Sequence, residues 1–154
     1  MKIVHTKDVP WGEGMQRGSY FQGRKKLAGE AISCSVWELP TGKKSYPFHK
    51  HNVTEEALLV ISGSAKVRSS TGLTEIGPGD FVLFPPGDDT HQLINDGSEV
   101  LVYFAMSVSK GVDITEYPDS GKVHAVVGAA PNLKSLVFRQ KDAVGYFDGE
   151  PDAE

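Results

Sequence analysis

The sequence is short of the features that mark several large classes of protein. Cysteine occurs once among its 154 residues, as Cys34, so the chain cannot form an internal disulfide and offers no CxxC pair for metal or redox chemistry. No window approaches the roughly 18 uninterrupted apolar residues of a membrane-spanning helix, and the first residues lack the apolar run of a signal peptide. We therefore expect a cytoplasmic protein without membrane association.

An excess of either charge is also missing. The chain has 16 basic and 20 acidic residues and a net charge of -4, whereas a surface that binds nucleic acid normally carries a broad basic excess. Motifs for nucleotide binding are missing as well: the stretch GEGMQRGS, at residues 12–19, has neither the spacing of a phosphate-binding loop nor a strand before it. Composition predicts no nucleic-acid partner, and the catalytic residues are unknown from sequence.

What the sequence does contain is a regular series of short apolar segments. Hydrophobic residues make up 39% of the chain and charged residues 23%, which is the balance of a folded globular domain. β-Branched and aromatic runs alternate with Gly, Pro, Asn or Asp breaks, and none shows helical spacing with caps. This pattern predicts an all-β fold of antiparallel hairpins, folded as a sandwich or a barrel. The runs are AISCSVWEL, ALLVIS, SAKVRSS, LTEI, DFVLF, HQLIN and EVLVYFAMSV.

Three regions differ in this pattern, although a chain of this length fits one domain. Residues 1–30 are rich in glycine, and we interpret them as an N-terminal arm. Residues 31–107 carry the strand pattern and form the predicted barrel. Residues 108–154 carry a weaker pattern and end in the acidic stretch DGEPDAE. We interpret them as a C-terminal extension that packs on the barrel or completes it.

The stretch FHKHNVTEE, at residues 48–56, collects groups that bind protons or metals. On a strand, His49 and His51 point to the same side, so their imidazoles can share one ion. The nearby carboxylate comes from Glu55 or Glu56. Strand parity favours Glu55, but a turn at NVT resets that parity. His91, 40 residues after His51 in PPGDDTHQLIN, reaches the same interior if the strands close as a barrel.

These stretches resemble the two sequence motifs of the cupin superfamily. FHKHNVTEEALLVISG resembles the first motif, in which six residues separate a Glu from a Gly; here ALLVIS separates Glu56 from Gly63, which selects Glu56. GDFVLFPPGDDTHQLIN resembles the second motif, with matching positions at Gly79, Pro85, Gly87, His91 and Asn95. The resemblance implies a double-stranded β-helix, or jelly-roll barrel, whose metal ligands are His49, His51, Glu56 and His91.

The chain departs from the usual motifs at two turns. One extra residue stands between Gly42 and His49, and another stands between Gly87 and His91. Because both fall in turns, we expect them to leave the strands in register.

The implied ligand set predicts one divalent metal ion and no organic cofactor. Imidazole and carboxylate donors suit Fe, Mn, Ni, Co or Zn, and the lack of a thiolate argues against a structural zinc site. Glu55 is then a solvent-facing neighbour or a hydrogen-bond acceptor for one imidazole. His5 and His124 lie outside both motifs, and we interpret them as ordinary surface or core residues.

Three functions fit such a site. The stretches PPGDDTHQLIN and YPDSGKV resemble single-domain cupins described as sugar-phosphate-isomerase-like, in which the metal acts on a small polar substrate. The alternatives are an Fe(II)-dependent dioxygenase and a non-catalytic module that binds or senses a small ligand, so whether the chain is an enzyme stays open. Lys43, Lys44 or Lys50 could attract a phosphate, although we favour their interpretation as solvated turn lysines. Candidates to line the barrel are Tyr46, Gln92, Asn95, Tyr103 and Met106. Because small cupins commonly pair through their sheets, we also expect a homodimer.

Overall fold

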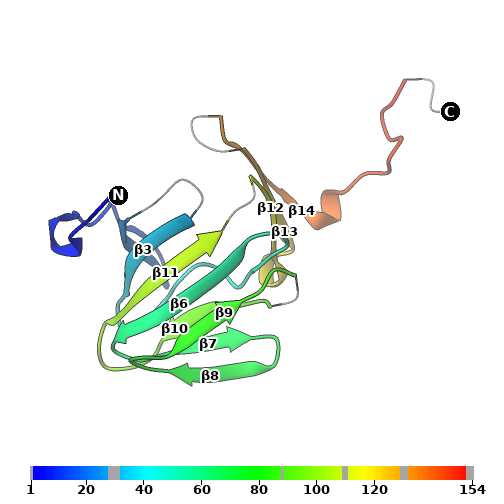
Figure 1. The fold of residues 1–154 in the computed structure, drawn as a ribbon. Coiled ribbons are helices and arrows are strands. Elements are labelled where there is room, and N and C mark those ends of the chain that lie inside the picture. The colour runs from blue at the N-terminus through cyan, green and yellow to red at the C-terminus, as the bar shows by residue number, and fades with distance from the viewer. Residues whose placement is uncertain (1, 28–31, 88, 109–110, 129–131, 152–154) are drawn as a thin grey trace.

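Two sheets contain most of the regular structure in the computed structural model, which describes residues 2–27, 32–87, 89–108, 111–128 and 132–151 (Figure 1). None of the helices in these ranges could span a bilayer. The elements are η1 (Thr6–Asp8), β1 (Met15–Arg17), β2 (Tyr20–Lys26), β3 (Ile32–Leu39), β4 (Lys43–Lys44), β5 (Lys50–His51), β6 (Glu55–Ser62), β7 (Ala65–Ser69), β8 (Gly72–Ile76), β9 (Phe81–Phe84), β10 (Gln92–Asn95), β11 (Leu101–Val108), β12 (Val112–Tyr117), η2 (Pro118–Ser120), β13 (Lys122–Val127), β14 (Lys134–Arg139) and η3 (Gln140–Asp142).

The larger sheet has ten strands and curls round an interior. Its order is β8-β7-β10-β4-β2-β3-β11-β6-β9, with β1 paired to β2, and Figure 1 shows β3, β11 and β6 running side by side. The pairings are antiparallel, apart from the parallel contact between β2 and β4. This curled sheet is a double-stranded β-helix, so the all-β jelly-roll barrel predicted from the sequence is confirmed.

A smaller sheet joins the C-terminal segment to the barrel. Its order is β14-β13-β12-β5, and β12 pairs with β5 at Thr115–His51 and Glu116–Lys50. On the N-terminal side, β2 pairs with β3 along four residues, from Gly23–Glu38 to Lys26–Ser35. Strands from both flanking regions are thus hydrogen-bonded to the barrel. The domain boundaries at residues 30 and 107 stay a prediction.

The barrel interior is apolar at one end, where the inward side chains of β3, β6 and β11 pack together. Leu101, Leu39 and Val60 are 0%, 1% and 2% exposed. Because successive side chains of a strand point to opposite faces, every second residue of these strands faces the interior and packs in the core. That core consists of Trp37, Leu39, Leu58, Val60, Ala65, Val67, Ile76, Phe84, Leu93, Leu101 and Tyr103.

Two motif residues serve the fold. Gly63 has a φ of +74°, and a Cβ there would lie 2.4 Å from the carbonyl oxygen of Val100, so the turn after β6 accepts glycine alone without strain. Asn95, fully buried, donates through its amide to the carbonyls of Leu39 at 2.7 Å and Glu99 at 2.8 Å. Its position in the motif is therefore explained by the turn that it holds after β10.

Candidate metal centre

The four predicted ligands, His49, His51, Glu56 and His91, are here called the cluster. Two of its histidines, His49 and His91, form an antiparallel β-bridge with each other. The N–H of His49 donates to the carbonyl of His91 at 3.1 Å, and the N–H of His91 donates to the carbonyl of His49 at 2.7 Å. Because opposed residues of an antiparallel pair project to the same side, their imidazoles lie together, with ring centroids 4.6 Å apart. His51 follows on β5, and Glu56 lies near the start of β6.

The structure brings the three predicted histidine ligands to one carboxylate oxygen of the fourth, Glu56. Glu56 Oε2 lies 3.3 Å from His91 Nε2, 3.4 Å from His51 Nε2 and 4.0 Å from His49 Nε2. Ligand atoms of His49, His51 and Glu56 all lie within 4.8 Å of one another. Donors about 2.0–2.2 Å from one ion are at most about 4.4 Å apart, so the distances from Glu56 Oε2 to the three Nε2 atoms suit a shared ion. The role of the four residues as ligands stays a prediction.

In each imidazole, Nε2 faces Glu56, and the second ring nitrogen, Nδ1, has a hydrogen-bond acceptor of its own. Nδ1 of His49 donates to the carbonyl of Pro47 at 2.7 Å, and Nδ1 of His91 donates to the carbonyl of Asp89 at 2.9 Å. Nδ1 of His51 lies against the Asp113 carboxylate. With the proton held on Nδ1, the lone pair of a neutral ring is on Nε2, the atom that faces Glu56. Three nitrogen donors and one carboxylate oxygen therefore fit Fe, Mn, Ni, Co or Zn.

Without a metal, the pKa values of the cluster residues shift in different directions. Burial, together with the neighbouring imidazoles of His91 and His51, lowers the pKa of His49 to about 4. Burial also opposes a charge on His51, but hydrogen bonds and attraction from Glu56 and Asp113 overcome it and raise the pKa of His51 to about 9. Burial acts to raise the pKa of Glu56, but its contacts with the imidazoles of His51 and His91 hold that pKa far below its ordinary value. Without a metal, His51 is therefore the imidazole that holds a second proton, between the carboxylates of Glu56 and Asp113.

Glu56 faces the imidazoles, whereas its neighbour Glu55 is exposed. The chain bends at residues 52 and 53, between β5 and β6, and this bend resets the alternation that the two histidines follow. Parity counted along a single strand therefore selects the wrong carboxylate, and the spacing to Gly63 selects the one that lies in the cluster.

A cavity of about 390 Å³ opens beside the cluster. Tyr46, Tyr103 and Met106 line it, as the sequence suggested. Gln92 and Asn95 are not among its described lining residues: both are buried, and Gln92 donates through its amide to the carbonyl of Tyr46 at 2.7 Å. Side chains with hydroxyl groups also line the cavity, from strands β3, β11 and β12 and from the connections on either side of β5. They are Ser33, Ser35, Ser45, Thr54, Ser107 and Thr115.

Several cavity residues could not be identified from sequence. Arg24 on β2, Asp113 and Tyr117 on β12, and His124 on β13 all line the cavity. Arg24, Asp113 and His124 lie outside every stretch that the sequence analysis singled out, and Tyr117 begins the stretch YPDSGKV without having been identified as a cavity residue. His124 was interpreted above as an ordinary residue.

The lysines proposed as phosphate-binding groups lie elsewhere. Lys43 donates through Nζ to the carbonyl of Gly18 at 3.2 Å, and Nζ of Lys50 is 3.7 Å from a carboxylate oxygen of Glu116. With Lys44, they are absent from the described lining of the cavity. These positions agree with the interpretation of the three as solvated turn lysines, because short basic runs at turns carry no information about which way the side chains face.

Comparisons with known proteins place the barrel in a family. Residues 35–108 match the family model of the cupin domain, and no curated protein matches the chain. Among solved structures, a candidate sugar phosphate isomerase from Acidithiobacillus ferrooxidans ATCC 23270 is 25% identical, with a TM-score of 0.77, over 87% of this chain and 88% of that one. A sugar phosphate isomerase of the cupin superfamily from Silicibacter pomeroyi DSS-3 is 17% identical, with a TM-score of 0.80, over 96% and 98%. The polyketide cyclase RemF from Streptomyces resistomycificus is 20% identical, with a TM-score of 0.59, over 70% and 79%.

Proposed function

We propose, since the chain belongs to the cupin superfamily, that it is a metal-dependent protein that acts on a small polar molecule in its barrel, in the manner of a sugar phosphate isomerase. One divalent ion would be held by Nε2 of His49, His51 and His91 and by the Glu56 carboxylate. The approach of these three Nε2 atoms to one carboxylate oxygen, at 3.3 to 4.0 Å, carries the proposal. When bound, such an ion acts as a Lewis acid on a carbonyl or hydroxyl oxygen.

Arg24 is the group that would bind the anionic end of the substrate. Among the described residues that line the cavity, it carries the single Lys or Arg side chain. Its guanidinium lies over the ring of Trp37, 5.1 Å from the centroid, and this contact restrains the side chain at the cavity wall. A guanidinium forms paired, charge-assisted hydrogen bonds with a phosphate group. The position of Arg24 therefore favours a phosphorylated substrate over a neutral one.

His124 is the proposed carrier of the proton that an aldose–ketose interconversion moves. It lies in the cavity wall, opposite Thr115 in the β12–β13 register, and its Nε2 is 2.7 Å from the hydroxyl of Ser135. Imidazole is the side chain that exchanges protons most readily near neutral pH. The similarity to two structures named as sugar phosphate isomerases, over 87% and 96% of the chain, supports the same reaction class.

Metal content and turnover together test this function. Unsupplemented purified protein is analysed for metals, then incubated with aldose and ketose phosphates under NMR observation, with oxygen uptake recorded in parallel. We expect about one divalent ion per chain and isomerisation without oxygen uptake. Stoichiometric iron with substrate-dependent oxygen consumption would instead indicate the Fe(II)-dependent dioxygenase. Ligand binding that survives complete chelation, without turnover, would indicate the non-catalytic module. Either of these two results overturns the isomerase proposal.

We further infer that the homodimer expected from the sequence forms through the outer face of β3, β11, β6 and β9. One apolar ladder crosses these four strands in register. It consists of Val36, Phe104, Leu59 and Phe81. Phe81, Ile61 and Leu83 on this face are 59%, 51% and 48% exposed, whereas antiparallel sheets that face water carry polar residues outward. Because this ladder contains no charge, it can meet a second copy of itself about a twofold axis without like-charge contacts.

The opposite wall of the barrel provides the control. Its outer ladder across β8, β7, β10 and β4 contains Glu75, Lys66, Ile94 and Lys44, so it suits solvent. We expect Phe104→Glu to convert a dimer into monomers in light scattering, and Leu73→Glu, which alters an exposed apolar residue on β8, to leave the mass unchanged. A wild-type mass equal to the single chain of 16.7 kDa would overturn this interface.

A further inference from the structure

The three imidazoles of the cluster are oriented by two different kinds of acceptor. His49 and His91 each donate through Nδ1 to a main-chain carbonyl two residues earlier in their own segment. His51 instead donates to the carboxylate of Asp113, 62 residues later in the chain. Two histidines are therefore oriented from within the barrel, and the third is oriented from the C-terminal sheet.

Asp113 is fixed from several directions. It is 6% exposed, and its Oδ1 accepts hydrogen bonds from the main-chain N–H of Val53 at 3.0 Å and of Thr54 at 3.2 Å. Its Oδ2 accepts the hydroxyl of Thr115 at 3.2 Å as well as Nδ1 of His51. A buried carboxylate needs such donors to remain ionised. The same side chain therefore holds His51 and the bend that leads from His51 to Glu56.

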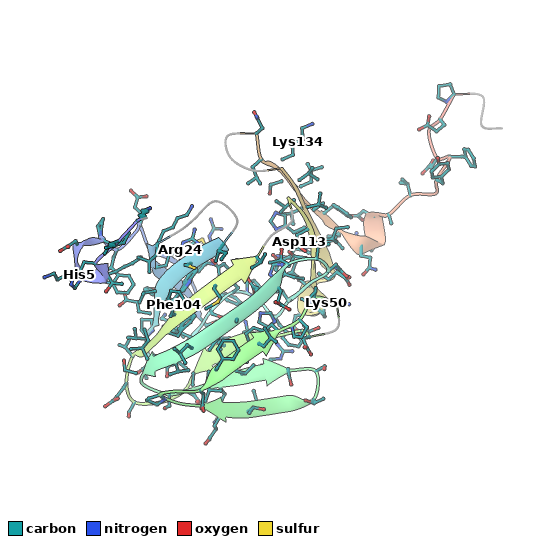
Figure 2. All side chains as sticks on the ribbon, in the orientation of Figure 1. His5, Arg24, Lys50, Phe104, Asp113 and Lys134 are labelled. Carbon is teal, nitrogen blue, oxygen red and sulfur yellow. The ribbon has the colours of Figure 1, made fainter. Side chains whose placement is uncertain are left out.

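The backbone around this contact is also shared between the two sheets. β12 pairs with β5 at His51 itself. The main-chain N–H of Asn52 donates to the carbonyl of Ile114 at 3.0 Å, and its side-chain amide donates to the same oxygen at 2.7 Å. Figure 2 shows Asp113 and Lys50 where the small sheet meets the barrel. The segment that carries His51 is therefore held in place by β12.

We infer that Asp113 is a positioning residue of the metal centre, and that the C-terminal sheet is for this reason a component of the centre. Asp113 holds the proton of His51 on Nδ1 and turns Nε2 toward Glu56, so that this nitrogen would be oriented to bind an ion. This inference rests on the ligand set of the proposed function. Acceptors that hold a metal-ligating imidazole typically change metal affinity by about 10- to 100-fold when they are removed.

Titration of the full chain with Co²⁺ tests the inference. We expect Asp113→Asn to weaken Co²⁺ binding about 10- to 100-fold, because an amide NH₂ then faces groups that are themselves donors. Glu116→Gln is the matched control: it lies on the same strand, and its carboxylate contacts Asn52 and Lys50, so the affinity should not change. Wild-type affinity in Asp113→Asn overturns the inference but leaves the ligand set intact. Failure of the wild-type chain to bind Co²⁺ overturns both.

A double-mutant cycle separates positioning from general stability. If Asp113 acts through His51, Asp113→Asn produces little further loss of Co²⁺ affinity in a His51→Ala background. An equal loss in both backgrounds means that Asp113 supports the fold alone and overturns the inference. Should Asp113→Asn fail to fold, ¹⁵N NMR of the histidine rings in the zinc-loaded wild-type chain tests the same claim. We expect a proton on Nδ1 of His51 and zinc on its Nε2, and zinc on Nδ1 contradicts the inference.

Discussion

The filled end and the open end of the barrel are built from the same three strands. At the filled end, β3, β6 and β11 turn Leu39, Val60 and Leu101 inward, and these side chains are at most 2% exposed. At the open end, the same strands present residues such as Glu56 and Ser107 to the cavity. Alternation decides which side chains face the interior. The residue type at each end then decides whether the interior is packed or left open for a ligand.

This division of labour has an energetic reason. A cluster of imidazoles beside a carboxylate is costly to bury without a metal, because ionised groups lose hydration. The packed end stabilises the fold independently, so the open end can hold groups that contribute little to stability. Substitutions at the open end should therefore change metal affinity, whereas substitutions at the filled end should change the free energy of unfolding.

The largest effect is expected from Glu56→Gln at the open end. The carboxylate is the common neighbour of all three Nε2 atoms, and its loss removes both a donor and the negative charge. We expect metal affinity to fall by more than the roughly 100-fold typical of a supporting residue, while the circular dichroism of the metal-free protein stays native. Unchanged metal content in this variant would contradict the assignment.

Leu101→Ala at the filled end should do the reverse. Leu101 is fully buried in the core, and truncation of a packed leucine costs about 2–5 kcal/mol through lost burial and a residual cavity. Urea unfolding measures this loss. The affinity of the remaining folded protein for metal should match wild type, and a parallel loss of affinity would show that the two ends are coupled.

Metal binding should depend on pH through His51. Its pKa is raised to about 9 in the metal-free chain, against about 6.5 for an unperturbed histidine, so the bound proton stabilises the fold below pH 6.5 and this contribution is lost as the pH rises through 9. A metal ion displaces the same proton. Affinity should therefore rise about tenfold per pH unit between pH 6.5 and 9. Calorimetry in buffers of different ionisation enthalpy should show about one proton released near pH 7.5, and no proton release would contradict the account.

The smallest effect is expected at the cavity wall, from Arg24→Met. Loss of a hydrogen bond to a charged group costs about 1.5–3 kcal/mol, so KM for a phosphorylated substrate should rise roughly 10- to 100-fold. The kcat and the metal content should change little. Arg24→Lys keeps the charge without the paired donors, so its KM should lie between those of the wild type and Arg24→Met. An equal rise in KM for the unphosphorylated sugar would show that Arg24 does not bind the phosphate group.

The barrel and the proximity of its three histidines to Glu56 could be predicted from the sequence better than the cavity around them. The spacing of nearby residues was sufficient to identify Glu56, because Gly63, seven positions later, is fixed by the turn after β6. Gly63 has a positive φ and lies so close to Val100 that no side chain fits there. Asp113 could not be identified, because its contact with His51 spans 62 residues and depends on how the small sheet docks. Arg24 was missed because β2 lies in a region without regular apolar alternation.

The central claim is that four side chains hold one ion at the open end of the barrel. The most direct measurement is a crystal structure of the metal-loaded chain with anomalous diffraction at the absorption edge of the metal. The account predicts a single peak bound by Nε2 of His49, His51 and His91 and by the carboxylate of Glu56. A peak elsewhere, or one that His91 does not ligate, would contradict it.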